Sequence, residues 1–140
     1  MKKTKSQISL EYLVVVIFLM TAAFILFIYV NQTTQEIIAI NKVTNAVNKI
    51  AITADEVYAL GPGSKLLVEI ELPPIVVDYI FDQNRVGFRV KTFDSNSDIW
   101  RATKAKLVGG NLPKKEGTYV IKAEMLKNNS RDLNVWRVSP

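Results

Sequence analysis

The chain has 140 residues, of which 49% are hydrophobic, and its 18 Lys and Arg against 13 Asp and Glu give a net charge of +5. It contains no His and no Cys, which excludes imidazole bases, thiol nucleophiles, disulfides and the usual zinc sites. We therefore expect no enzyme, no catalytic residue, no cofactor and no metal. Lys2, Lys3 and Lys5 supply three of the five charges and the other basic residues are scattered, so no nucleic acid partner is expected.

The N-terminal region is dominated by an apolar run from Tyr12 to Val30, nineteen residues without a charged side chain. As a helix it would be about 28 Å long, close to the roughly 30 Å hydrocarbon core of a bilayer. Because the basic stub precedes it, the positive-inside rule predicts a cytoplasmic N-terminus and an exported C-terminal part. A secretory signal peptide is disfavoured, since cleavage after Ala22-Ala23 would leave a long apolar remnant.

Glu11 stands directly before this run. A carboxylate that enters hydrocarbon costs about 2.5–3.5 kcal/mol on insertion scales, so such a residue usually has a partner. Alternatively, Glu11 lies at headgroup depth, where an acidic residue near a helix N-terminus is favoured by the helix dipole. For an isolated glutamate the second interpretation is preferred.

The segment KSQISLEYL, Lys5 to Leu13, resembles the class III signal peptide of archaeal type IV pilin-like proteins. The resemblance implies that a prepilin peptidase removes residues 1–6 by cutting between Ser6 and Gln7. Ser6 is less diagnostic than the glycine that the family often has there. The resemblance also implies that Glu11 pairs with the α-ammonium of Gln7 in a neighbouring subunit, so that neither charge is buried alone.

No Gly or Pro occurs between Gln7 and Leu60, and Gly61-Pro62-Gly63 then stops the helix. We therefore predict one helix over residues 7–60, with 12–30 in the membrane. Its outer part has apolar residues at 3-4-3-4-3 spacing, typical of a helix that packs along one seam. These predicted packing residues are Ile40, Val43, Val47, Ile50, Ala54 and Val57. The seam fits docking on the chain's own head, packing between filament subunits, or a parallel coiled-coil dimer, for which it is short.

Residues 61–140 alternate between short apolar-polar strands and turns, which predicts a small antiparallel sheet or sandwich. The expected fold class is therefore α+β, a long N-terminal helix, transmembrane and then amphipathic, that carries a β-rich head. Strands are predicted at 66–72, 75–80, 86–90, 99–108, 118–127 and 133–138, with turns at 82–84 and 94–98 and a loop at 109–117. The segments ADEVYALGPGSK at 54–65 and GTYVIK at 117–122 are also similar to the archaeal family.

Two kinds of short motif occur at possible surface positions. Asp94-x-Asn96-x-Asp98 begins like a calcium loop, but Ile99 and Ala105 replace the required Gly and Glu, which excludes an EF-hand. A looser calcium turn is less expected than a plain hairpin turn. Asn31 and Asn128 each begin an N-x-[ST] sequon and are candidate N-glycosylation sites, Asn128 being the better one because it lies in a predicted turn.

The resemblance implies a structural subunit of an archaeal type IV pilus-like filament, with a role in adhesion. The expected location is the cytoplasmic membrane for the precursor and a cell-surface filament after processing. Expected partners are copies of itself or related pilins, the prepilin peptidase, and membrane lipid before assembly. The alternative is a single-span extracellular binding domain that does not polymerise. A third hypothesis is an archaellum filament subunit. The resemblance counts against it, because such subunits typically lack the early glutamate.

Overall fold

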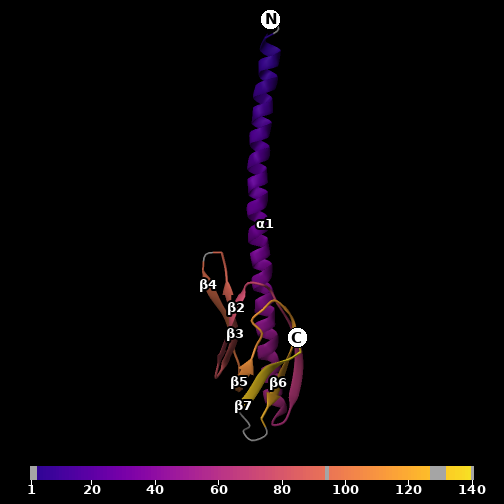
Figure 1. Ribbon diagram of the computed structural model, residues 1–140, viewed down its shortest axis with the longest axis vertical. Coiled ribbons are helices and arrows are strands. Elements are labelled where there is room, and N and C mark those ends of the chain that lie inside the picture. The colour runs from indigo at the N-terminus through magenta and orange to yellow at the C-terminus, as the bar shows by residue number, and fades with distance from the viewer. Residues whose placement is uncertain (1–2, 94, 127–131, 140) are drawn as a thin grey trace. The chain divides into compact units, whose positions relative to one another are not determined.

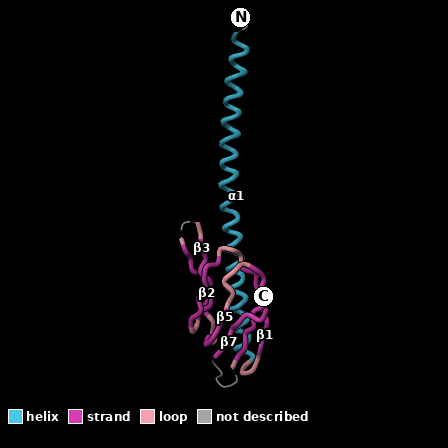
Figure 2. The backbone as a smooth tube through the Cα atoms, in the orientation of Figure 1, coloured by secondary structure: helices cyan, strands magenta, loops and turns pink. Residues whose placement is uncertain are grey.

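The structure, a computed structural model, describes residues 3–93, 95–126 and 132–139 (Figure 1). One helix comes first and seven strands follow within the described residues (Figure 2). The predicted α+β fold is confirmed. The elements are α1 (Lys3–Leu60), β1 (Lys65–Leu72), β2 (Val76–Asp82), β3 (Arg85–Lys91), β4 (Asn96–Ala102), β5 (Lys106–Asn111), β6 (Gly117–Met125) and β7 (Asp132–Ser139).

The chain divides into two compact units, residues 1–37 and residues 38–140. The first contains the N-terminal part of α1, and the second, called here the head unit, contains the rest of α1 and all seven strands. The boundary therefore lies within the helix, some twenty residues before the sequence break at Gly61. A helix whose outer turns carry an apolar seam gains stability by packing against the sheets that follow it, which explains why those turns belong to the head unit.

Helix α1 ends at the Gly-Pro-Gly turn that the sequence predicts. Gly61 has a φ of +92°, a left-handed conformation that favours glycine, and its N–H donates to Val57 O at 3.2 Å. The Ser64 hydroxyl lies 2.9 Å from the same carbonyl oxygen and 2.6 Å from Gly61 O. These bonds satisfy backbone groups that the end of the helix would otherwise leave unpaired. The turn then leads directly into β1.

The strands form a four-stranded sheet of order β1-β6-β7-β5 and a three-stranded sheet of order β2-β3-β4. All neighbouring pairs are antiparallel except β5 and β7, which are parallel. The chain leaves the small sheet after β4 and joins the far edge of the large one. From β5 to β7 the chain passes through β6, which lies on the other side of β7 in the sheet, and this long connection allows β5 and β7 to be parallel.

The single strand predicted over 99–108 is wrong, because two strands in different sheets replace it. The chain leaves the small sheet at Thr103, whose N–H donates to Asn84 O at 2.9 Å and whose buried hydroxyl lies 3.0 Å from Ala105 O. The N–H of Lys104 donates to the Asp55 carboxylate of α1 at 2.7 Å. The predicted turn at 94–98 and the loop at 109–117 are also too long, because β4 begins at Asn96 and β5 continues to Asn111.

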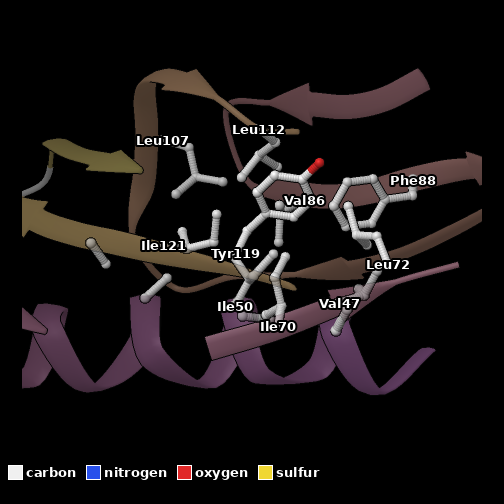
Figure 3. Packing of buried hydrophobic residues seen from close by; sticks show 14 of the residues in the cluster. Val47, Ile50, Ile70, Leu72, Val86, Phe88, Leu107, Leu112, Tyr119 and Ile121 are labelled. Carbon is white, nitrogen blue, oxygen red and sulfur yellow. The ribbon is translucent and has the colours of Figure 1, made fainter. Parts of the chain in front are cut away.

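One apolar core joins α1 to both sheets within the head unit (Figure 3). Val47 and Ile50 of α1 point into it from the helix, and Phe88 of β3 and Ile121 of β6 reach it from the two sheets. Each of these four side chains is at most 2% exposed. Burial of an aliphatic or aromatic side chain stabilises a fold by about 1.5–3 kcal/mol relative to leaving it in water. The outer turns of α1 therefore belong to the core of the head unit.

Candidate processing and assembly site

The predicted cleavage point lies inside α1. The backbone of Ser6 and Gln7 is helical, because α1 begins at Lys3. Position 11 follows position 7 by one helical turn, a rise of about 6 Å, on the same side of the helix. Glu11 is exposed in the single chain. Removal of residues 1–6 would leave an α-ammonium one turn before this carboxylate.

The apolar run of α1 is exposed in the single chain. Tyr12 and Phe18 are each 73% exposed and Met20 is 72% exposed, and nearly all other large side chains of the run are exposed as well. The hydroxyl of Thr21 donates to Ile17 O at 2.8 Å, so the helix itself satisfies this polar group. By length and composition the run can cross a membrane, and it is compatible with membrane anchoring. An apolar surface of this extent needs lipid or protein neighbours.

The predicted packing seam lies in the head unit, buried against the chain's own sheets. Val43, Val47, Ile50, Ala54 and Val57 are each at most 2% exposed, and Ile40 is half-buried. Of the three arrangements that the spacing allowed, the structure therefore shows docking on the head for this stripe. Ala46 and Ala51 are equally buried and widen the packed face beyond a two-helix seam. These residues are consequently not available for a coiled-coil dimer in this state.

Polar contacts tie α1 to β1 on one side. Lys42 Nζ donates to Glu71 Oε1 at 2.6 Å, and Lys49 Nζ donates to the carbonyl oxygen of Glu69 at 3.2 Å. The partners lie 29 and 20 residues apart in sequence, so no local pattern could reveal them. Both lysines are exposed, so each contact adds only a modest amount of stability. They connect β1 to the exposed side of the helix.

A second set of polar contacts ties α1 to the small sheet and its exit. Arg101 of β4 donates to Asn48 Oδ1 at 3.0 Å. The Asp55 carboxylate accepts the backbone N–H of Lys104 at 2.7 Å. Asp55 thus accepts a hydrogen bond from the backbone at the point where the chain passes from the small sheet to the large one. Sequence reasoning missed this role because Asp55 has no distinguishing local context.

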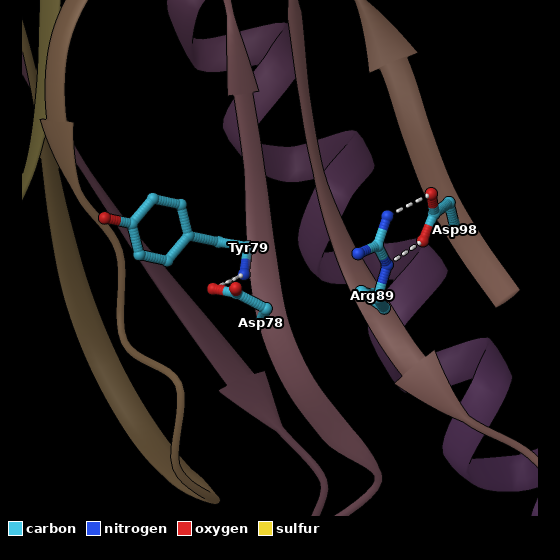
Figure 4. A network of polar contacts seen from close by, with 4 residues as sticks. All are labelled: Asp78, Tyr79, Arg89 and Asp98. Carbon is cyan, nitrogen blue, oxygen red and sulfur yellow. Dashed lines mark hydrogen bonds and ion pairs between the residues drawn. The ribbon is translucent and has the colours of Figure 1, made fainter. Parts of the chain in front are cut away.

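The calcium turn considered for residues 94–98 is not supported by the geometry of the described residues. Asn96 and Asp98 lie in strand β4, and Asp94 lies outside the described residues. Arg89 Nε and its terminal nitrogen donate to the two Asp98 oxygens at 2.7 and 2.9 Å (Figure 4). These hydrogen bonds lower the pKa of Asp98 below its usual range. The carboxylate is thus already engaged by a cation from the neighbouring strand.

The two candidate glycosylation sites differ in what the structure describes. Asn31 is exposed on α1, directly after the apolar run, and the Thr33 hydroxyl of its sequon donates to Tyr29 O at 3.1 Å. Asn128 lies outside the described residues. Among the described residues, no group of three or more metal-ligating side chains was found.

The most informative candidate site is therefore the stretch from Ser6 through Glu11 to the end of the apolar run at Val30. It places one exposed carboxylate, Glu11, directly before an exposed apolar run. Comparisons of the chain with protein-family models, with curated proteins and with solved structures found no match. The function is accordingly inferred from these residues and their geometry.

Proposed function

We propose that this chain is a pilin, a structural subunit of an archaeal type IV pilus-like filament on the cell surface, with a role in adhesion. The precursor lies in the cytoplasmic membrane with its N-terminus inside and residues 61–140 outside. A prepilin peptidase cuts between Ser6 and Gln7 and removes residues 1–6. Copies of the processed chain, or related pilins, then assemble through the apolar part of α1.

The observation that carries the proposal is the exposed apolar run of α1, which follows directly on the segment from Gln7 to Glu11. A bilayer and a core of packed helices can each cover such a surface, so one segment serves before and after assembly. Cleavage creates an α-ammonium that would be costly to bury alone. Glu11 of a neighbouring subunit neutralises it, which favours the register that brings the two together.

A membrane-anchored binding domain that does not polymerise is the second candidate. It is favoured by the burial of Val47 and Ile50 in the chain's own head unit, because these residues then need no neighbouring subunit. Such a domain requires only the apolar run. It leaves the Gln7 and Glu11 pair without a role, and for this reason we prefer the pilin.

Replacement of Glu11 distinguishes the two candidates. In native cells, Glu11→Ala should still be processed, because the peptide bond before Gln7 is unchanged. Its incorporation into filaments should be lost or strongly reduced, since removing one partner of a buried ion pair costs about 3–5 kcal/mol. Processing is followed by the mass of the chain, and incorporation by immunogold electron microscopy of sheared surface filaments.

Glu56→Ala is the matched control. Glu56 is exposed on the same helix but lies in the head unit, so its replacement should leave assembly at the level of the unmodified chain. Normal incorporation of Glu11→Ala would contradict the pairing. Failure of the unmodified chain to appear in any polymer would favour the anchored binding domain.

A further inference from the structure

We propose that one end of the head unit binds the surface of the lipid bilayer in the anchored protein, with the side chain of Phe93 inserted at the interface. The proposal rests on the membrane anchoring of residues 12–30 that is part of the proposed function, and it does not require polymerisation. It assigns lipid as a partner of the head unit itself, in addition to the apolar run.

The contacts between α1 and the strands show which ends of these elements lie together. Strand β1 runs antiparallel to α1, since the turn before β1 bonds to Val57 and the end of β1 bonds to Lys42. The chain from β4 to β5 bonds to Asp55, and β4 itself bonds to Asn48 further back along the helix. The start of β4, and with it the β3–β4 turn, therefore lies toward Ile38.

Three exposed apolar side chains lie at this end of the head unit, called here the entry end: Ile38, Val77 and Phe93. They are 45%, 50% and 86% exposed. Among the described large hydrophobic residues none is more exposed than Phe93, and the highest value in the apolar run is 73%. Single exposed apolar residues are ordinary on protein surfaces, but three at one end form a feature that needs an explanation.

The backbone holds Phe93 and Val77 in these exposed positions. The N–H and the hydroxyl of Thr92 both bond to Ser95 O, at 2.8 and 2.7 Å, which closes the turn that carries Phe93. Val77 is the extra residue where the register between β2 and β3 shifts, between Val76 and Asp78. Bulges of this kind redirect a side chain away from the sheet. Val76 pairs with Val90, so the bulge lies close to the same turn.

Two ion pairs lie at the entry end, and Lys91, the last residue of β3, is a further exposed cation there. Lys42 bonds to Glu71 at 2.6 Å and Lys114 bonds to Asp78 at 2.8 Å. The hydrogen bond from Lys114 lowers the pKa of Asp78, so this ion pair persists at neutral pH. Because the two pairs are neutral overall, apolar insertion should suffice for binding to an uncharged bilayer, and Lys91 should add a preference for anionic lipid.

Chain connectivity favours lipid as the occupant. Seven residues, Asn31 to Ile37, separate the apolar run from the entry end, and they are helical. At 1.5 Å per residue they rise about 10 Å. The polar headgroup region of a bilayer is roughly 5–8 Å thick on each side of the hydrocarbon core. The length of the connection therefore keeps the start of the head unit within about 10 Å of the hydrocarbon edge, which allows its entry end to reach the interface. Exposed aromatic and aliphatic side chains are stabilised there.

Site-directed spin labelling tests the proposal, because the chain contains no Cys and one introduced Cys can be labelled alone. The full chain carries Val77→Cys, Leu67→Cys or Ile25→Cys and is reconstituted at high lipid dilution into phosphatidylcholine vesicles. Leu67 is the matched control, 63% exposed on β1. Accessibility to oxygen, which is concentrated in lipid, is compared with accessibility to a water-soluble nickel chelate.

We expect oxygen to dominate at positions 25 and 77 and the nickel chelate to dominate at position 67. Adding Phe93→Ser to Val77→Cys should shift the label at 77 toward the nickel chelate, while the far-ultraviolet circular dichroism stays unchanged.

Three outcomes would overturn this inference. If the nickel chelate reaches position 77 as readily as position 67 while oxygen dominates at position 25, the head unit does not bind lipid and the pilin proposal stays intact. If the high oxygen accessibility at position 77 disappears when the protein is diluted further in lipid, a second protein chain covers this position. If the nickel chelate dominates at position 25, the chain is not anchored, which contradicts both proposals.

Discussion

Two glycines illustrate how single positions constrain the head unit. Gly87 of β3 pairs with Trp100 of β4, and a Cβ built on Gly87 would lie 2.7 Å from the Cβ of Trp100 and closer still to Ile99 O. Trp100 is half exposed, and the Arg85 guanidinium lies over its ring, 5.1 Å from the ring centroid. Gly61 has open space around it but a left-handed backbone. The first glycine is therefore required by crowding and the second by conformation.

Gly87→Ala should lower the free energy of unfolding by about 1–3 kcal/mol, because the added methyl group overpacks the contact with β4. Gly61→Ala should lower it by about 1–2 kcal/mol, because alanine is strained in the left-handed region. Asn tolerates that region, so Gly61→Asn should recover part of the loss, whereas Gly87→Asn should be at least as unfavourable as Gly87→Ala. Denaturant unfolding of the full chain in detergent measures all four. If Gly87→Asn were more stable than Gly87→Ala, steric crowding at position 87 would be contradicted.

The ion pair between Arg89 and Asp98 predicts a dependence of stability on pH. Hydrogen bonds from Arg89 hold the pKa of Asp98 below its ordinary value, so the folded state binds this proton less readily than the unfolded chain does. The stabilisation is therefore present at pH values above the ordinary pKa of Asp, about 4, and is lost as the pH falls through the lowered pKa of the folded state.

Asp98→Asn should consequently make the loss of stability below about pH 4 less steep. Asp82→Asn is the control, because Asp82 lies 3.9 Å from Arg85 and makes a longer contact in the same sheet. Thermal unfolding as a function of pH measures both variants. Equal effects of the two substitutions on the acid side would argue against a specific role of the Arg89 and Asp98 pair.

At the scale of elements, the outer turns of α1 have one face in the core and one in water. Ile50 is 1% exposed and Ile52 is 46% exposed, although only one residue separates them. Ile50→Ala should lower the free energy of unfolding of the head unit by about 2–5 kcal/mol, because it removes buried contacts and leaves a cavity. Ile52→Ala should change it by no more than about 0.5 kcal/mol. Denaturant unfolding in detergent, followed by near-ultraviolet circular dichroism, measures the difference, and equal losses would contradict docking of α1 in the head.

Local patterns predict most elements but not their partners. The Gly61 turn and the alternation in β1 and β3 are visible in sequence because they depend on neighbouring residues. The break at Thr103 could not be predicted, since the groups that satisfy its backbone come from Asn84 and from Asp55 of α1. The parallel pairing of β5 with β7 depends on the placement of β6 on the other side of β7, which no local alternation encodes.

On the scale of the whole molecule, α1 serves two environments. Its apolar run, residues 12–30, is exposed, and its outer turns are stabilised by the head unit. The apolar run and the position of Glu11 could be predicted from sequence because charge and hydropathy are local properties. The entry end could not be predicted from sequence, because its residues are far apart in the chain and only the fold brings them to one end. These residues are Ile38, Val77 and Phe93.

The mass of the N-terminal peptide of the protein, isolated from the native membrane and surface fractions, tests the central claim most directly. The account predicts that the mature chain begins at Gln7, with residues 1–6 absent and the apolar run retained. A chain that keeps Met1 in the surface fraction, or one that begins after Ala23, would contradict it.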